Sequence, residues 1–204
     1  YALGGYYTGI NGWEFSVEGY YKDMRNVLEY KDGVSFFGSS SGWENKVEMG
    51  KGRSAGIEFM AQKTAGKTTG WLSYTLSKSD RKFTKGGINN GEWFPYKYDR
   101  RHSINLTINH KFSDRIDIGA SWVFYTGGTS TIPEEKTTVI RPHNGANNGF
   151  LWYGTYDNTN SSPTIGDVSY IEHRNNFRLP ASHRLNLGVN FNKKTKHGMR
   201  TWNI

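Results

Sequence analysis

The chain has 204 residues, a net charge of +8 and no cysteine. This length suits one all-β domain or part of a larger one, and the lack of cysteine excludes disulfides, cysteine nucleophiles and thiolate metal sites. No stretch approaches about eighteen consecutive apolar residues, so a transmembrane helix is excluded, whereas a transmembrane β-barrel needs apolar residues only at alternate positions. The basic residues are scattered over connections and form no run, which favours solubility and loop charge over a nucleic-acid partner.

In chain order, alternation of apolar and polar residues predicts a series of strands, because successive side chains of a strand point to opposite faces. A strand candidate at 2–9 ends in a tight Asn-Gly turn, and a long strand follows over 13–30. The later runs lie at 57–62, 72–77, 185–191 and 201–204.

The clearest pattern is a pair of runs at 102–112 and 116–126, joined by the polar link 113–115. This spacing predicts an antiparallel hairpin. Each run has about ten residues, which is the length a tilted strand needs to cross the hydrocarbon layer of a bilayer.

The connections between the predicted strands alternate between short and long, with long ones at 31–50, 79–101 and 128–182. Transmembrane barrels have short periplasmic turns and long extracellular loops, so the alternation favours such a barrel. The polar faces carry mostly Ser, Thr, Asn and Gly, which suits a wet interior better than the Lys and Glu of a soluble sheet. The side chains expected to face the lumen include Glu58, Asn105, Asn109, Asp117, Arg184 and Asn186.

Several segments, taken together, carry a resemblance to a known family. They are WEFSVEGYYKDMRNVLEY at 13–30, the stretch 50–79, NGEWFPYKYDRRHSINL at 90–106, ASWVFYTGGTSTIPE at 120–134 and NNFRLPASHRLNLGVNF at 175–191. The chain resembles the C-terminal part of the β-barrel of a TonB-dependent outer-membrane receptor of the Bacteroidetes type.

The resemblance implies an antiparallel transmembrane β-barrel in the bacterial outer membrane. Residues 1–204 would supply about eight of roughly 22 strands, as the C-terminal portion of one barrel domain, with both ends truncated and the plug domain absent. It also implies energy-coupled uptake of a siderophore, vitamin or glycan. The partners would be outer-membrane lipid, the substrate, and a TonB-type transducer reached through the missing plug.

Two groups of residues are candidates for a site. The polar group before two of the strands is expected to form a structural ion-pair network at the rim, and ligand recognition is the alternative; it comprises Asp99, Arg100, Arg101, His102, His183 and Arg184. Aromatic residues in the long connections are candidates for contacting a ligand, and packing between loops is an equal alternative; they are Trp93, Phe94, Tyr96, Trp152 and Tyr153.

The sequence contains no catalytic constellation, no cofactor motif and no metal-ligand spacing, so we expect neither an enzyme nor a cofactor. A passive porin or an adhesin-type barrel is the alternative to an active receptor. A soluble β-sandwich that binds carbohydrate is a less favoured one, because the short and long connections alternate.

Overall fold

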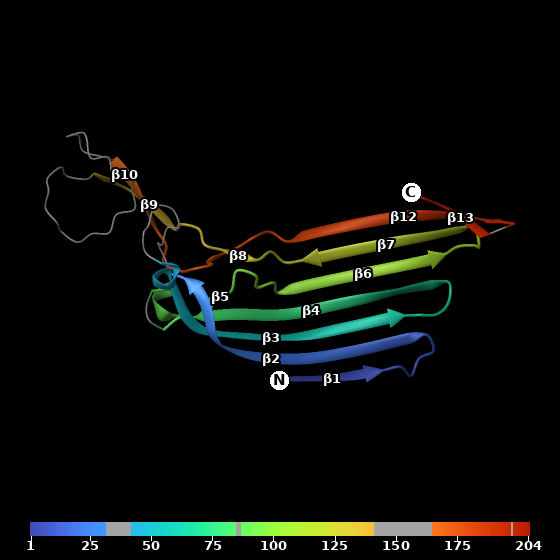
Figure 1. The fold of residues 1–204 in the computed structure, drawn as a ribbon, viewed down its shortest axis with the longest axis horizontal. Coiled ribbons are helices and arrows are strands. Elements are labelled where there is room, and N and C mark those ends of the chain that lie inside the picture. The colour runs from blue at the N-terminus through green and yellow to red at the C-terminus, as the bar shows by residue number, and fades with distance from the viewer. Residues whose placement is uncertain (32–41, 85–86, 141–164, 197) are drawn as a thin grey trace.

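The computed structural model describes residues 1–31, 42–84, 87–140, 165–196 and 198–204 (Figure 1). The main sheet is antiparallel and has nine strands, of which eight follow the order β1-β2-β3-β4-β6-β7-β12-β13. Their bounds are β1 (Ala2–Tyr7), β2 (Trp13–Tyr30), β3 (Val47–Lys63), β4 (Thr68–Lys82), β6 (His102–Lys111), β7 (Ile116–Tyr125), β12 (Ser182–Thr195) and β13 (Gly198–Asn203). The predicted all-β antiparallel architecture is confirmed, and the described sheet is open between β1 and β13.

Five further strands and two helical turns lie in the connections. The strand β5 (Phe94–Pro95) pairs with β4, β8 (Thr129–Ser130) pairs with β11 (Phe177–Arg178), and β9 (Glu135–Ile140) pairs with β10 (Ile165–Tyr170). The 3-10 turns are η1 (Trp43–Lys46) and η2 (Asn89–Gly91). None of the described helical segments has the length and apolar character needed to span a membrane.

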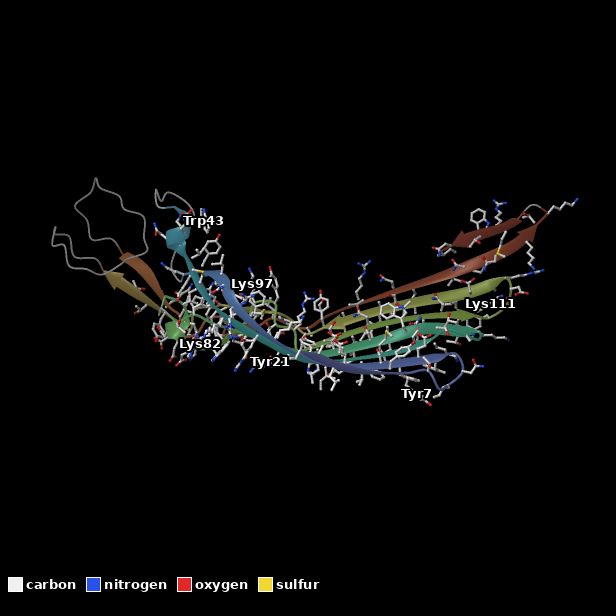
Figure 2. The ribbon with its side chains drawn as sticks, turned by 60° about the horizontal axis from the view of Figure 1, so that its bottom comes forward. Tyr7, Tyr21, Trp43, Lys82, Lys97 and Lys111 are labelled. Atoms are coloured by element: carbon white, nitrogen blue, oxygen red, sulfur yellow. The ribbon has the colours of Figure 1, made fainter. Side chains whose placement is uncertain are left out.

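The short turns all lie at one end of the sheet and the long connections at the other (Figure 1). We call these the short-turn end and the long-loop end. The central hairpin was predicted correctly: β6 and β7 pair antiparallel, with Leu106 opposite Trp122. Figure 2 shows the sheet curving along its strands, with β2 and β3 bending beyond Tyr21 towards Trp43.

Two predicted boundaries were wrong. The strand β3 begins at Val47 and β4 extends to Lys82, so both reach further into the long-loop end than the alternation at 57–62 and 72–77 indicated. Glycine explains the error in β3, because Gly50, Gly52 and Gly56 interrupt the pattern of side chains. A Cβ at Gly50 would overlap the Phe83 ring, because this ring packs directly against the glycine backbone.

The register places apolar residues of neighbouring strands in continuous rows. One row crosses seven strands from β1 to β12, and it consists of Tyr7, Phe15, Ala61, Leu72, Leu106, Trp122 and Leu185. We call this side of the sheet the apolar face. The other side, the polar face, carries all six residues expected to face the lumen: Glu58, Asn105, Asn109, Asp117, Arg184 and Asn186.

The sheet is a single layer. None of the described residues of β1, β2, β6, β7, β12 or β13 is buried. The ten residues of β6 rise roughly 34 Å, and a tilt of about 40° brings this to about 26 Å, close to the height of the apolar band of outer-membrane barrels. The apolar face therefore matches a bilayer, and the buried core lies elsewhere.

Candidate functional site

The core of the described residues lies at the long-loop end. Phe83 and Ile88 have no exposed surface and Phe94 is 3% exposed, with Val27 packed against them. The Phe83 and Phe94 rings stack with centroids 6.0 Å apart. Phe94, expected as a ligand contact, is therefore covered by its neighbours and serves the packing of the second long connection.

Asp99 is the centre of a buried ionic cluster at the long-loop end. Its side chain has no exposed surface, and one carboxylate oxygen accepts bonds from Arg178 at 2.6 Å and from Arg101 at 3.0 Å. The other oxygen accepts a bond from the Ser79 backbone N–H at 2.6 Å. The same Arg178 donates to the carbonyls of Asp99 and Gly127. Asp99 thus joins the end of β4, the connection before β6 and the strand β11.

The other members of the predicted polar group lie apart from Asp99. The Arg100 guanidinium lies over the Tyr125 ring, 4.1 Å from its centroid. His102 Nδ1 and the Tyr74 hydroxyl are hydrogen-bonded at 2.9 Å. His183 pairs with Phe124 across β12 and β7.

Arg184 donates to the side-chain oxygen of Asn186 at 3.0 Å, on the polar face. The structure therefore brings Asp99 and Arg101 together and separates them from the pair His183 and Arg184. The sequence analysis missed Arg178, which follows Asp99 by 79 positions. The only local feature that could have marked Arg178 as a partner of Asp99 is its position directly before the Leu-Pro pair at 179–180.

A second ionic cluster lies at the end of β3 and β4. Asp80 is 4% exposed and pairs with Arg53 at 3.1 Å and with Lys78 at 3.4 Å. The Arg53 guanidinium also stacks on the Trp93 ring, 4.3 Å from its centroid. Trp93 remains 37% exposed, so the ion pair holds an aromatic ring whose other side is accessible.

Residues 174–176 connect the third long connection to the second and to the end of β2, and we call them the loop clamp. The Arg174 backbone N–H donates to Asn89 Oδ1 at 2.6 Å, in the second connection. Its guanidinium donates to the Tyr30 carbonyl at 2.7 Å and to Glu29 Oε1 at 3.4 Å, where β2 ends. These contacts hold the third connection against the second connection and the end of β2.

The two asparagines of the loop clamp complete these contacts. Asn175 has a φ of +55°, a left-handed conformation that asparagine tolerates better than most residues. Its amide donates to the Pro95 carbonyl at 2.7 Å. Asn176 donates to the Ile132 carbonyl and accepts from the Ile132 N–H, both at 3.0 Å. The clamp therefore joins the end of the third connection to its start, through the bonds between Asn176 and Ile132.

A run of stacked rings and cations lies beside the clusters. The Arg81 guanidinium covers Tyr96, 4.0 Å from the ring centroid, and Tyr96 meets Tyr98 edge to face at 5.4 Å. Tyr98 is 65% exposed, and the Lys97 ammonium lies 5.0 Å from its ring centroid. Alternating rings and cations of this kind can bind a sugar ring or an anionic group.

Two other candidate aromatic residues, Trp152 and Tyr153, lie outside the described residues. Within the ranges that the structure describes, no group of His, Cys, Asp and Glu could hold a metal ion. At the short-turn end, the Lys111 ammonium lies 2.7 Å from the Asp114 carboxylate. The hydrogen bond and the charge of Lys111 lower the pKa of Asp114, whose side chain is exposed.

Comparison with known proteins gives one match. A family model described as "TonB dependent receptor-like, beta-barrel" covers residues 1–204. A search among curated proteins found no match. A search among solved structures found none either.

Proposed function

Since the chain belongs to the TonB-dependent receptor β-barrel family, whose members are outer-membrane receptors and transporters, we propose that it forms the C-terminal part of a barrel that imports a scarce nutrient. The nutrient class is a siderophore, a vitamin or a glycan, and the receptor is of the Bacteroidetes type. The chain lies in the bacterial outer membrane. A plug domain elsewhere in the receptor would fill the barrel and pass the energy of a TonB-type transducer to the substrate.

The two ends of the sheet support an orientation. Outer-membrane barrels have short turns on the periplasmic side and long loops outside the cell. The long-loop end, with the loop clamp and both ionic clusters, is therefore placed on the cell surface. The polar face lines the lumen, and the apolar face meets lipid.

The ring-and-cation run is the surface that we assign to substrate contact. Arg81 belongs to the polar face by strand alternation, since it pairs with Gly52 and lies two positions after Ser79. Tyr96 stacks on it, so the run lies on the lumen side at the mouth of the barrel. The observation that carries this assignment is the 65% exposure of Tyr98 beside a ring that is already held in place. Trp93 stacks on Arg53, whose side chain belongs to the apolar face by the same alternation, so the assignment rests on the run of Arg81, Tyr96, Lys97 and Tyr98 alone.

The test is accumulation of labelled siderophores, vitamins and glycans by cells that carry the full-length receptor. Uptake should require an intact transducer, and Tyr98→Ala should raise the half-saturating concentration by about tenfold, the loss of one stacking contact. The matched control is Tyr170→Ala, since Tyr170 is also exposed at 55% but lies in β10, away from the run. Uptake that persists without the transducer would instead identify a passive barrel.

A further inference from the structure

The lumen side of the mouth carries three pairs of a cation and a tyrosine ring, and we call these pairs the cationic track. They are Arg81 on Tyr96, Lys97 on Tyr98 and Arg100 on Tyr125, with cation-to-centroid distances of 4.0, 5.0 and 4.1 Å. The first two pairs belong to the ring-and-cation run. The third lies where β7 ends at the long-loop end (Figure 1). Tyr125 is on the polar face, because its register partner Ser103 lies two positions before Asn105.

No neighbouring acid neutralises the cations of the track. Within the described ranges, no carboxylate forms an ion pair with Arg81, Lys97 or Arg100. The acids next to two of them in the chain, Asp80 and Asp99, are each paired with two other cations. The mouth therefore keeps the positive charge of all three cations of the track.

The carboxylates of the barrel wall are too distant to compensate this charge. The register row of Tyr125 runs through Ser103 and Thr75 to Glu58, which is the first carboxylate on that side of the row. Three strand spacings of about 4.8 Å place Glu58 about 14 Å from Tyr125 along the wall. The screening length at physiological salt is about 8 Å, so Glu58 has little effect on Arg100.

The Tyr125 ring holds Arg100 in place and leaves its hydrogen-bond donors available. Arg100 is exposed, and its side chain makes no hydrogen bond within the part of the chain that the structure describes. A guanidinium presents its N–H donors in a fixed fork that matches the paired oxygens of a carboxylate or a phosphate. Stacking on the ring sets the plane of this fork before a ligand arrives, so Arg100 is suited to bind an oxyanion.

We propose that the imported nutrient carries oxyanion groups (carboxylate, phosphate or sulfate) and that the cationic track binds them. This inference rests on the proposed function and narrows it, because neutral glycans and neutral vitamins are excluded as substrates. A cleft lined by charge of one sign concentrates ligands of the opposite sign. Lys97 and Tyr98 meet the nutrient at the rim, and Arg100 binds an oxyanion group deeper in the lumen.

The test measures binding to the full-length receptor in mild detergent, without the transducer. The probes are two matched pairs, citrate with its neutral trimethyl ester and glucose 6-phosphate with glucose. The charged member of at least one pair should bind at least about tenfold more tightly than its neutral partner, and added salt should weaken this binding. Arg100→Gln should weaken it about tenfold, through the loss of a charge-assisted hydrogen bond. Arg100→Lys keeps the charge and should lose less.

The matched control is Arg115→Gln, which should leave the binding of both charged probes unchanged. Arg115 is also exposed and also forms no ion pair within the described ranges. It lies in the short turn between β6 and β7, at the opposite end of the sheet from the track.

Two results would overturn the proposal. One is equal affinity for the charged and the neutral member of both pairs. The other is wild-type affinity in Arg100→Gln, with the variant keeping its heat-modifiable mobility on gels as evidence of a folded barrel. Active import is tested separately. Anion binding that is lost in Arg100→Gln supports the track even where uptake does not need the transducer, whereas transducer-dependent uptake of a neutral nutrient rejects the track and keeps active import.

Discussion

Replacing Asp99 by asparagine should loosen the long-loop end without unfolding the sheet. The substitution keeps the shape of the side chain but replaces the oxygen that accepts from Arg178 and Arg101 by an NH2 donor. Breaking a fully buried ion pair costs about 3–5 kcal/mol. Because the two arginine side chains are 31 and 34% exposed, water solvates them in part, and we expect about 2–3 kcal/mol.

Hydrogen exchange in the folded receptor measures this local loss. The Thr129 N–H bonds to the Lys97 carbonyl, and the Leu179 N–H bonds to the Gly128 carbonyl. Both bonds lie in the connections that Asp99 joins, so both amides should exchange about 30- to 150-fold faster in Asp99→Asn. Amides in the centre of β6 and β7 should keep their wild-type rates.

The control is Asp114→Asn, which removes an exposed carboxylate from a short turn at the other end of the sheet. This variant should leave exchange at Thr129 and Leu179 unchanged. The reasoning is refuted if the two amides exchange at wild-type rates in Asp99→Asn, because the buried carboxylate would then contribute nothing to holding the connections together.

Three further predictions follow from the faces, the loop clamp and the short turn. Leu106→Arg should lower the free energy of folding into lipid vesicles by about 2–4 kcal/mol, whereas Asn105→Arg, one position away on the polar face, should cost less than about 1 kcal/mol; equal losses would contradict the assignment of the faces. Arg174→Gln should speed proteolysis of the long connections in intact cells, with the barrel still folded. Unchanged cleavage would mean that Arg174 does not hold these connections together. Lys111→Met should raise the pKa of Asp114 in an NMR titration. The Lys111 pairing stabilises the folded turn above the ordinary pKa of Asp114 and is lost as the pH falls through the lowered one, so denaturation should become less pH-dependent below about pH 4 in this variant.

The sheet could be predicted well where side chains alone decide the structure. In the hairpin of β6 and β7, strict alternation fixes both the faces and the register, since a shift by one residue would turn Leu106 and Trp122 to the wrong side. The same reasoning failed at the start of β3. There the residues on the polar side are glycines, which have no side chain to show the alternation. On the other side, Lys51 and Arg53 are charged, because they lie nearer the long-loop end than the apolar residues of β3.

The long-loop end could be predicted only in part. Local spacing singled out Asp99 and Arg101 as members of a polar group. Their partner Arg178 and the contact of Arg174 with Glu29, 145 positions apart, depend on how the connections return across the sheet. Nothing in a local pattern encodes such a return. Composition also could not separate Phe94 from Trp93, because one ring fills the core and its neighbour stacks on a guanidinium outside it.

The loop clamp has a consequence for how such a receptor can diversify. Arg174, Asn175 and Asn176 each donate to a backbone carbonyl, at Tyr30, Pro95 and Ile132. Every residue type offers that acceptor, so substitutions at these three partners leave the bonds available. The side chains around the mouth can therefore be substituted, and the substrate specificity can change, while the same three residues keep the loops in place. A library that varies the loop surface and retains residues 174–176 would yield more folded receptors than one that varies the clamp as well.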